Sequence, residues 1–348
     1  MGDNLEQIIG ALNGAVGDYL RRTGNGLATP MQLVRAGRPV AIQADAITRD
    51  GLSLAYPDAT PRLVVLVHGL MSTEIVFRMP TPPKAPIEPA EPHDEGAPDP
   101  PEDYGTLLAR DLGYTPLYVR YNSGLHVSEN GEALDALLEN LVLAYPRPIQ
   151  EIALLGHSMG GLVIRSACHA ATDKARTWLP LVKRAFYIGS PHLGAPLERF
   201  GNALAWALRN LPSPYTRLVA DIVNLRSSGV KDLRYANLRR EDWEGVDADA
   251  LLQNRRHPVP LLAHIRHHLV AATLVTDPLF SVLFGDALVP VPSARGQAKE
   301  HHRSAIFPQE HVRVLAPVDH LSLAHNADVY ALVRAWCEEE LPCSAGAA

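Results

Sequence analysis

The stretch that decides the fold is EIALLGHSMGGLVIRS, residues 151–166. An apolar run, residues 152–155, stops at Gly156, and a pattern with helical spacing begins at Gly160. Between them, Gly-His-Ser-Met-Gly fits the G-x-S-x-G nucleophile elbow, a turn so sharp that its central serine takes a strained backbone conformation. The motif needs a strand before it and a helix after it, and both are predicted here. We therefore expect Ser158 to stand at the carboxyl edge of a sheet as a nucleophile. The alternative is a chance glycine-serine turn.

Short apolar runs alternate with helical patterns along the rest of the chain. The runs are of the kind buried on both faces of a sheet, and they predict strands at residues 63–67, 117–121, 152–155, 185–188, 269–276 and 312–315. Helices are predicted at residues 104–112, 132–144, 160–171 and 327–339. This order predicts an α/β fold, a mostly parallel sheet with helices on both faces.

Three segments interrupt the alternation within a predicted single domain spanning residues 1–348. Residues 3–21, approximately, place their apolar side chains on one helical face, which predicts a packed N-terminal helix. Residues 80–101 contain nine prolines interleaved with acidic residues, which predicts an extended, solvated loop. Residues 197–254, approximately, carry two amphipathic patterns between successive strands and are predicted to form a helical cap.

Composition limits the classes of function. The chain has 348 residues, of which 47% are hydrophobic, and a net charge of −6 without a basic stripe, so nucleic acid is not an expected partner. No positively charged leader precedes an apolar block, and no window reaches about 18 apolar residues, so we expect a cytoplasmic protein without a membrane segment. Its cysteines, Cys168, Cys337 and Cys343, are expected to be reduced, with a Cys337–Cys343 disulfide as the minor alternative. Oligomeric state leaves no sequence signal.

A serine hydroxyl needs a base to take its proton and donors to stabilise the resulting oxyanion. HGLM, residues 68–71, follows the strand at 63–67, and in this setting the loop lends one backbone N–H while Met159, directly after the serine, lends the other. Leu70 is the predicted first donor, with Met71 as the alternative. His68 is predicted to brace the loop, because it precedes the serine where the chain order requires serine, acid and then histidine.

Position selects the base among 15 histidines. The base should follow the last strand directly, and His320 does so in VDHLSLAHN. His325 lies five residues further on, where we expect the final helix to have begun. His192, in GSPHLGAP, also follows a strand, but that strand comes directly after the elbow helix, so we expect His192 to shape the pocket.

The blocks HGLM, GHSMGG, GSPHLGAP, GDALVPVPSA and VDHLSL, in this order and spacing, resemble the lipase-type branch of the α/β-hydrolase family. That branch includes bacterial triacylglycerol lipases, carboxylesterases and the lipase-like domain of GPI inositol deacylases. The resemblance extends over about residues 62–336 and implies an eight-stranded-type sheet, a Ser-Asp-His triad and hydrolysis of carboxylic esters. Many bacterial lipases of this kind bind calcium near the histidine, but no full ligand set is evident around Asp319, so we expect neither a metal nor an organic cofactor.

Two aspartates compete for the acid of the triad. Asp277 follows the predicted strand at 269–276, where the generic fold places the acid, but it precedes Pro278 and can instead cap the next turn. Asp286 lies nine residues later, after Gly285, which permits a tight bend. The residues alone leave both open. The resemblance implies Asp286, because lipase-type proteins carry their acid in a G-D-x-x-V-P setting.

Substrate class is predicted from the approach to the serine. Met71, Leu193 and Trp206 are expected to line an apolar cleft suited to a hydrophobic ester, with polyesters sharing the same bond. The alternative is that these side chains pack the cap onto the sheet. An amidase or acyltransferase would use the same triad, and a binding protein on this fold would use none of it. Natural substrate, acyl-chain length and stereoselectivity are not encoded in these motifs.

Overall fold

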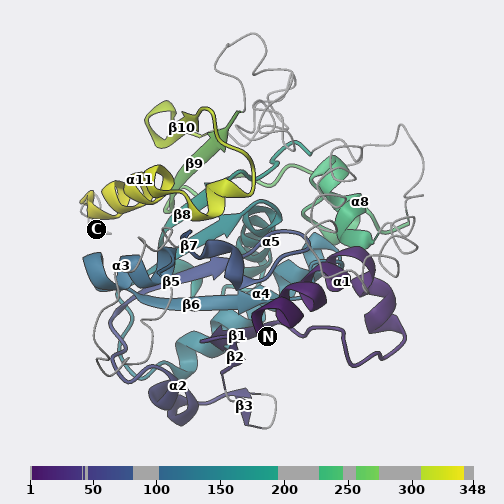
Figure 1. Ribbon diagram of the computed structural model, residues 1–348, viewed down its shortest axis with the longest axis horizontal. Coiled ribbons are helices and arrows are strands. Elements are labelled where there is room, and N and C mark those ends of the chain that lie inside the picture. The colour runs from purple at the N-terminus through teal and green to yellow at the C-terminus, as the bar shows by residue number, and fades with distance from the viewer. Residues whose placement is uncertain are drawn as a thin grey trace, which may run out of the picture.

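An eight-stranded sheet runs through the molecule in the order β10-β9-β8-β7-β5-β6-β1-β2 (Figure 1). The computed structural model describes residues 2–40, 42–43, 46–80, 102–194, 227–245, 256–273 and 307–340. The parallel strands are β5 Arg62–Val67, β6 Thr115–Arg120, β7 Glu151–His157, β8 Val182–Ile188, β9 Arg266–Ala272 and β10 Val312–Leu315. Two antiparallel strands, β1 Gln32–Arg35 and β2 Arg38–Pro39, close the other edge. The predicted mostly parallel α/β sheet is confirmed.

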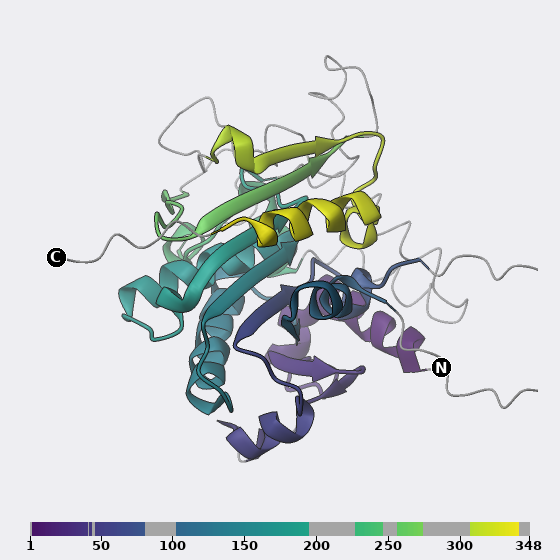
Figure 2. The same ribbon diagram turned by 90° about the vertical axis from the view of Figure 1, so that its left-hand side faces the viewer.

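Helices cover both faces of this sheet (Figure 2). On one face lie α2 Arg49–Ala55, α4 Val127–Ala144 and α5 Met159–Asp173. The other face carries α3 Tyr104–Leu112 and α11 Ala327–Glu338, the latter yellow in Figure 2. The remaining elements are α1 Gly2–Arg22, α8 Ser228–Tyr235, the pair β3 Ile42–Gln43 and β4 Ala46–Ile47, and 3-10 turns η1 Glu74–Phe77, η2 Leu179–Leu181, η3 Arg240–Asp242, η5 Gln309–His311 and η6 Ser322–His325.

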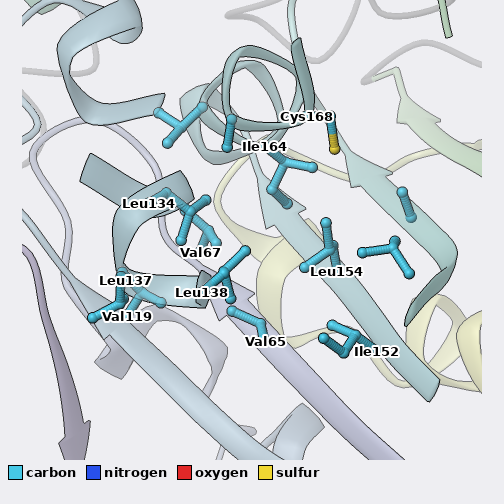
Figure 3. Close-up of a cluster of buried hydrophobic side chains, with 14 of the residues drawn as sticks. Val65, Val67, Val119, Leu134, Leu137, Leu138, Ile152, Leu154, Ile164 and Cys168 are labelled. Carbon is cyan, nitrogen blue, oxygen red and sulfur yellow. The ribbon is translucent and has the colours of Figure 1, made fainter. Parts of the chain in front are cut away.

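Successive side chains of the central strands enter two different cores because a strand points them alternately to its two faces. On β7, Leu154 packs among the side chains of α4 and α5, whereas Leu155 packs against α3 and α11. Both leucines are fully buried. Figure 3 shows the first of these cores, with Val65, Val67 and Leu154 from the sheet facing side chains of α4 and α5. Such two-sided burial explains why these strands read as continuous apolar runs.

Two differences separate the fold from the sequence prediction. The elements β1, β2 and α2 lie in a region where no strand or helix was predicted, and β2 is only two exposed residues long. Helix α4 begins at Val127, earlier than the predicted 132, because a capping box of His126 and Glu129 starts it. In addition, Val127 N–H donates to the buried carboxylate of Asp232, 2.8 Å away.

Helix α1 lies against the loops that follow β5 and β6, beside α8 (Figure 1). The helix bends at Val16, whose φ of −140° departs from helical geometry. Its first turns are tied to the body by ion pairs of Asp3 with Arg78 and of Glu6 with Arg120. No helix in the described part of the chain is long and apolar enough to cross a membrane.

The predicted loop at residues 80–101 and most of the predicted cap lie outside the described residues. Within the cap region, residues 227–245 contain α8 and η3. The thiols of Cys168 and Cys337 are free and buried, and Cys343 lies outside the described residues.

Candidate active site

Ser158 occupies the corner between β7 and α5 with a backbone conformation that L-residues rarely adopt. Its φ is 52° and its ψ is −122°, and its N–H donates to the carbonyl of Ile188 on the neighbouring strand, at 2.8 Å. Gly160, in the first turn of α5, passes so close to β5 that a Cβ there would lie 2.1 Å from the Val67 carbonyl oxygen. These features are those of a nucleophile elbow, with a strained serine facing a helix amino end.

The loop after β5 passes directly over Ser158. A Cβ added at Gly69 would lie 2.9 Å from the Ser158 Cβ. Leu70 follows, half-buried, and then Met71, whose φ is 57° and whose N–H donates to the hydroxyl of Ser123 at 3.0 Å. Because Met71 N–H already has an acceptor, the arrangement favours Leu70 over Met71 as an oxyanion donor. Met159, at the start of α5, belongs to the first turn of the helix, where backbone N–H groups have no intrahelical acceptor.

His68 is fully buried at the base of this loop. Its Nδ1–H donates to the Gly69 carbonyl at 2.9 Å, and its Nε2 accepts from the Tyr121 N–H at 3.3 Å. The Tyr121 ring stacks on it with centroids 4.3 Å apart, and the Tyr121 hydroxyl donates to the His68 carbonyl. Burial lowers the pKa of His68 to about 4, so the ring is neutral at physiological pH. Its position is that of a brace for the loop.

His320 lies on the loop after β10, at the same edge of the sheet as Ser158. It is 4% exposed, and its carbonyl accepts a hydrogen bond from Nε2 of His157, the residue directly before Ser158, at 3.0 Å. The two imidazole centroids are 5.1 Å apart. A Cβ at Gly189, at the end of β8, would lie 3.1 Å from the His320 Cε1. The structure therefore brings His320 to the elbow from 162 residues away in sequence.

His157 was not singled out by the sequence, although it stands inside the motif. Burial, with nearby His320, lowers its pKa to about 3, so its ring is neutral and donates from Nε2. A neutral donor at this point ties the loop that carries His320 to the strand that carries Ser158. Ser123 was also missed, because only the folded chain brings it to Met71.

The other two candidate histidines lie elsewhere. His325 is the last residue of η6, before α11, so the expectation that it had entered the final helix is wrong; Asn326 caps that helix instead. Its Nδ1 donates to the Val76 carbonyl at 3.1 Å. His192 is fully buried beside Arg165, with Nδ1 and Nη1 3.3 Å apart. Burial, and then the positive charge of Arg165, holds the pKa of His192 well below its ordinary value.

Of the remaining residues considered in the sequence, Asp319 and Leu193 lie within the described ranges and three others do not. Asp319 caps the η6 turn, accepting from the N–H groups of Leu321 and Ser322 at 3.0 Å. Burial raises the pKa of Asp319, but these hydrogen bonds and the one from the Ser322 hydroxyl outweigh that effect and lower it. Leu193 is half-buried in the turn after β8. Outside the described residues lie Asp277, Asp286 and Trp206.

In the loop after β10, the carboxylate of Asp319 directly precedes His320. Across the ranges that the structure describes, no group of three or more His, Cys, Asp or Glu side chains is arranged to hold a metal ion. The oxygens of Asp319 are engaged in capping its own turn.

Comparison with known proteins places the elbow in a family. The model of the PGAP1-like alpha/beta domain family matches residues 120–257, which include β7, the elbow serine and α5. Within these residues the chain is similar to that family. No curated protein matches this α/β-hydrolase at a significant level.

Solved structures similar to this α/β-hydrolase are lipases, esterases and a thioesterase. The mature Bacillus licheniformis lipase BlEst2 is 16% identical, with 79% of this chain and 91% of that chain covered and a TM-score of 0.44. A lipase-esterase related protein from Clostridium acetobutylicum is 12% identical, covering 80% and 95%, with a TM-score of 0.42. The RedJ thioesterase from the prodiginine biosynthetic pathway of Streptomyces coelicolor is 20% identical, covering 87% and 98%, with a TM-score of 0.41.

Proposed function

We propose that this α/β-hydrolase cleaves carboxylic esters through an acyl-enzyme formed on Ser158. The observation that carries the proposal is the strained backbone of Ser158 at a strand-to-helix corner, with buried His320 held at the same sheet edge by His157. A serine in this conformation presents its hydroxyl to the space above the sheet, and strain of this kind persists where function requires it.

In the proposed mechanism, His320 takes the proton of the Ser158 hydroxyl as its oxygen attacks the ester carbonyl. The N–H groups of Leu70 and Met159 stabilise the tetrahedral oxyanion. His320 then gives the proton to the leaving alcohol, and a water molecule, activated by the same imidazole, hydrolyses the acyl-enzyme. Asp286 is the proposed acid that orients the imidazole, with Asp277 as the alternative. No metal or organic cofactor takes part in these steps.

The proposed substrate is an ester with a hydrophobic acyl group. Support comes from half-buried Leu70, Met71 and Leu193, which lie on the two loops flanking the serine edge. A series of p-nitrophenyl esters of increasing acyl length, together with triglycerides and a polyester film, separates an esterase from a lipase or a polyester hydrolase. Matched anilides and added alcohol acceptors detect amidase and acyltransferase activity.

The nucleophile is tested with a fluorophosphonate probe, which labels activated serines. We expect Ser158→Ala to lose both labelling and ester turnover, whereas Ser53→Ala, an exposed serine on α2, keeps both. Labelling of Ser158→Ala at the wild-type rate would refute the assignment. Absence of labelling and turnover in the folded wild-type protein would favour a binding protein. Comparing Asp286→Asn with Asp277→Asn in the same assay identifies the acid, whose loss should lower kcat by about 10⁴-fold.

A further inference from the structure

Three glycines of α1 allow this helix to lie directly on the loops around the candidate site. A Cβ at Gly14 would lie 2.6 Å from the backbone nitrogen of Met71 and 2.7 Å from its Cα. The neighbouring positions are equally close: a Cβ at Gly10 would meet the Ser72 carbonyl oxygen at 2.9 Å, and one at Gly17 would meet the Asn122 side chain. At Gly14, α1 therefore lies directly against the backbone of the loop that contains Leu70.

Hydrogen bonds along the second half of α1 fix the helix in this position. The hydroxyl of Ser227 donates to the Gly14 carbonyl at 2.7 Å, and the Asn122 side-chain amide donates to the Gly17 carbonyl at 2.9 Å. The carboxylate of Asp18 accepts from Ser228 at the start of α8. With these bonds in place, α1 has little freedom to move away from the loop.

Met71 is consequently held from two sides. Gly14 lies against its backbone, and its N–H donates to the buried hydroxyl of Ser123. Its left-handed conformation, with φ of 57°, costs about 1–3 kcal/mol for a non-glycine residue and persists only when the surroundings impose it. The orientation of the Leu70–Met71 peptide depends on these two contacts. Through the Leu70 Cα, this peptide constrains the preceding one, which carries the Leu70 N–H.

We propose that Gly14 and Ser123 are positioning residues for ester hydrolysis, which hold the Leu70–Met71 segment so that the Leu70 N–H points at the oxyanion formed on Ser158. This proposal rests on the proposed function. It assigns α1, which lies outside the segment that resembles other hydrolases, to the machinery of the reaction. A donor misplaced by about 1 Å stabilises the transition state poorly while ground-state binding is little changed.

The test compares Gly14→Ala with Gly26→Ala, a matched control at a position with open space around its Cα. For Gly14→Ala we expect kcat for a p-nitrophenyl ester to fall about 10²-fold with KM within about twofold, as for loss of one oxyanion donor. Affinity for a phenylboronic acid, which mimics the tetrahedral intermediate, should fall in parallel with kcat/KM. Gly26→Ala should match the wild type in all three quantities.

A second variant covers the case in which Gly14→Ala does not fold, as judged by circular dichroism. Ser123→Ala removes the acceptor of the Met71 N–H without adding an atom, and the same fall in kcat at constant KM is expected. If the wild type hydrolyses the ester and the folded variants keep its kcat, the proposal is overturned while the proposed function stands. A rise in KM alone would overturn it as well. A wild type that hydrolyses no ester refutes the proposed function, and this inference falls with it.

Discussion

A single imidazole, that of His157, joins the two halves of the candidate site. Its Nε2–H holds the carbonyl of His320, and its backbone leads directly into Ser158. We predict that His157→Leu lowers kcat by about tenfold or more, because the loop that carries the base loses its tie to the nucleophile. His157→Gln, which keeps a side-chain donor, should recover part of that loss. Steady-state kinetics on both variants measures this, and equal kcat values in the two would show that the hydrogen bond is irrelevant.

His268 makes the stability of the protein depend on pH. It is fully buried between the rings of Phe186 and Trp336, and neither of its ring nitrogens has a hydrogen-bond partner among the described residues. Burial, and then nearby His311 and Arg184, lowers its pKa to about 3. The unfolded chain, with an ordinary histidine pKa of 6.5, therefore binds a proton between about pH 6.5 and 3 that the folded chain does not. The free energy of unfolding consequently falls as the pH falls through this window.

We predict that His268→Phe removes the part of the pH dependence of unfolding that His268 causes. The free energy of unfolding of the variant minus that of the wild type should be about 2 kcal/mol larger at pH 5 than at pH 8. At pH 8 the wild-type histidine is neutral in both the folded and the unfolded chain. Urea denaturation at the two pH values gives the quantity. Any cost of fitting the larger ring cancels, because it enters equally at both pH values. An identical difference at pH 5 and pH 8 would mean that His268 is not protonated on unfolding.

At the scale of elements, an ion pair ties β6 to η1, the turn after the loop that follows β5. Arg120, on β6, and Glu74, at the start of η1, are both buried, and Arg120 Nε donates to Glu74 at 2.9 Å. We predict that Glu74→Gln lowers the free energy of unfolding by about 3 kcal/mol, because a buried cation loses its main partner. The exposed pair of Arg110 with Glu102 supplies the control, and Glu102→Gln should cost less than about 1 kcal/mol. Equal losses in the two variants would contradict this.

Elements differ in how far the sequence predicts them, for a physical reason. The strand around Leu154 is buried on both faces, so it reads as a continuous apolar run, and the helix Tyr104–Leu112 is buried along one stripe, so its apolar residues recur with helical spacing. Both were therefore predicted closely. Strand β2 has two exposed residues and carries no such pattern. The elbow was predictable because its requirements are local. The contact of Gly14 with Met71 was not, since its two partners lie 57 residues apart and glycine shows no preference for a distant neighbour.

At the scale of the whole molecule, the sheet separates two hydrophobic cores. Adjacent residues of β7 pack in different cores: Leu154 faces α4 and α5, and Leu155 faces α3 and α11. We predict that Leu154→Ala and Leu155→Ala each lower the free energy of unfolding by about 2–5 kcal/mol, the cost of a large-to-small change in a packed interior. Urea unfolding curves provide the comparison. A loss below 1 kcal/mol in one variant would show that its face is poorly packed.

The position of α1 has a consequence for how the chain is made. Its contacts are with Met71, Asn122 and Ser227, so α1 finds the Ser227 hydroxyl only after more than two hundred further residues have been synthesised. Domains acquire such long-range contacts late, because the intervening chain must first be closed into place. Until Ser227 has emerged, the Gly14 carbonyl lacks this side-chain donor. The glycine contacts of α1 with Met71 and Asn122 thus become available early in synthesis, whereas the hydrogen bond from Ser227 that fixes the same helix becomes available late.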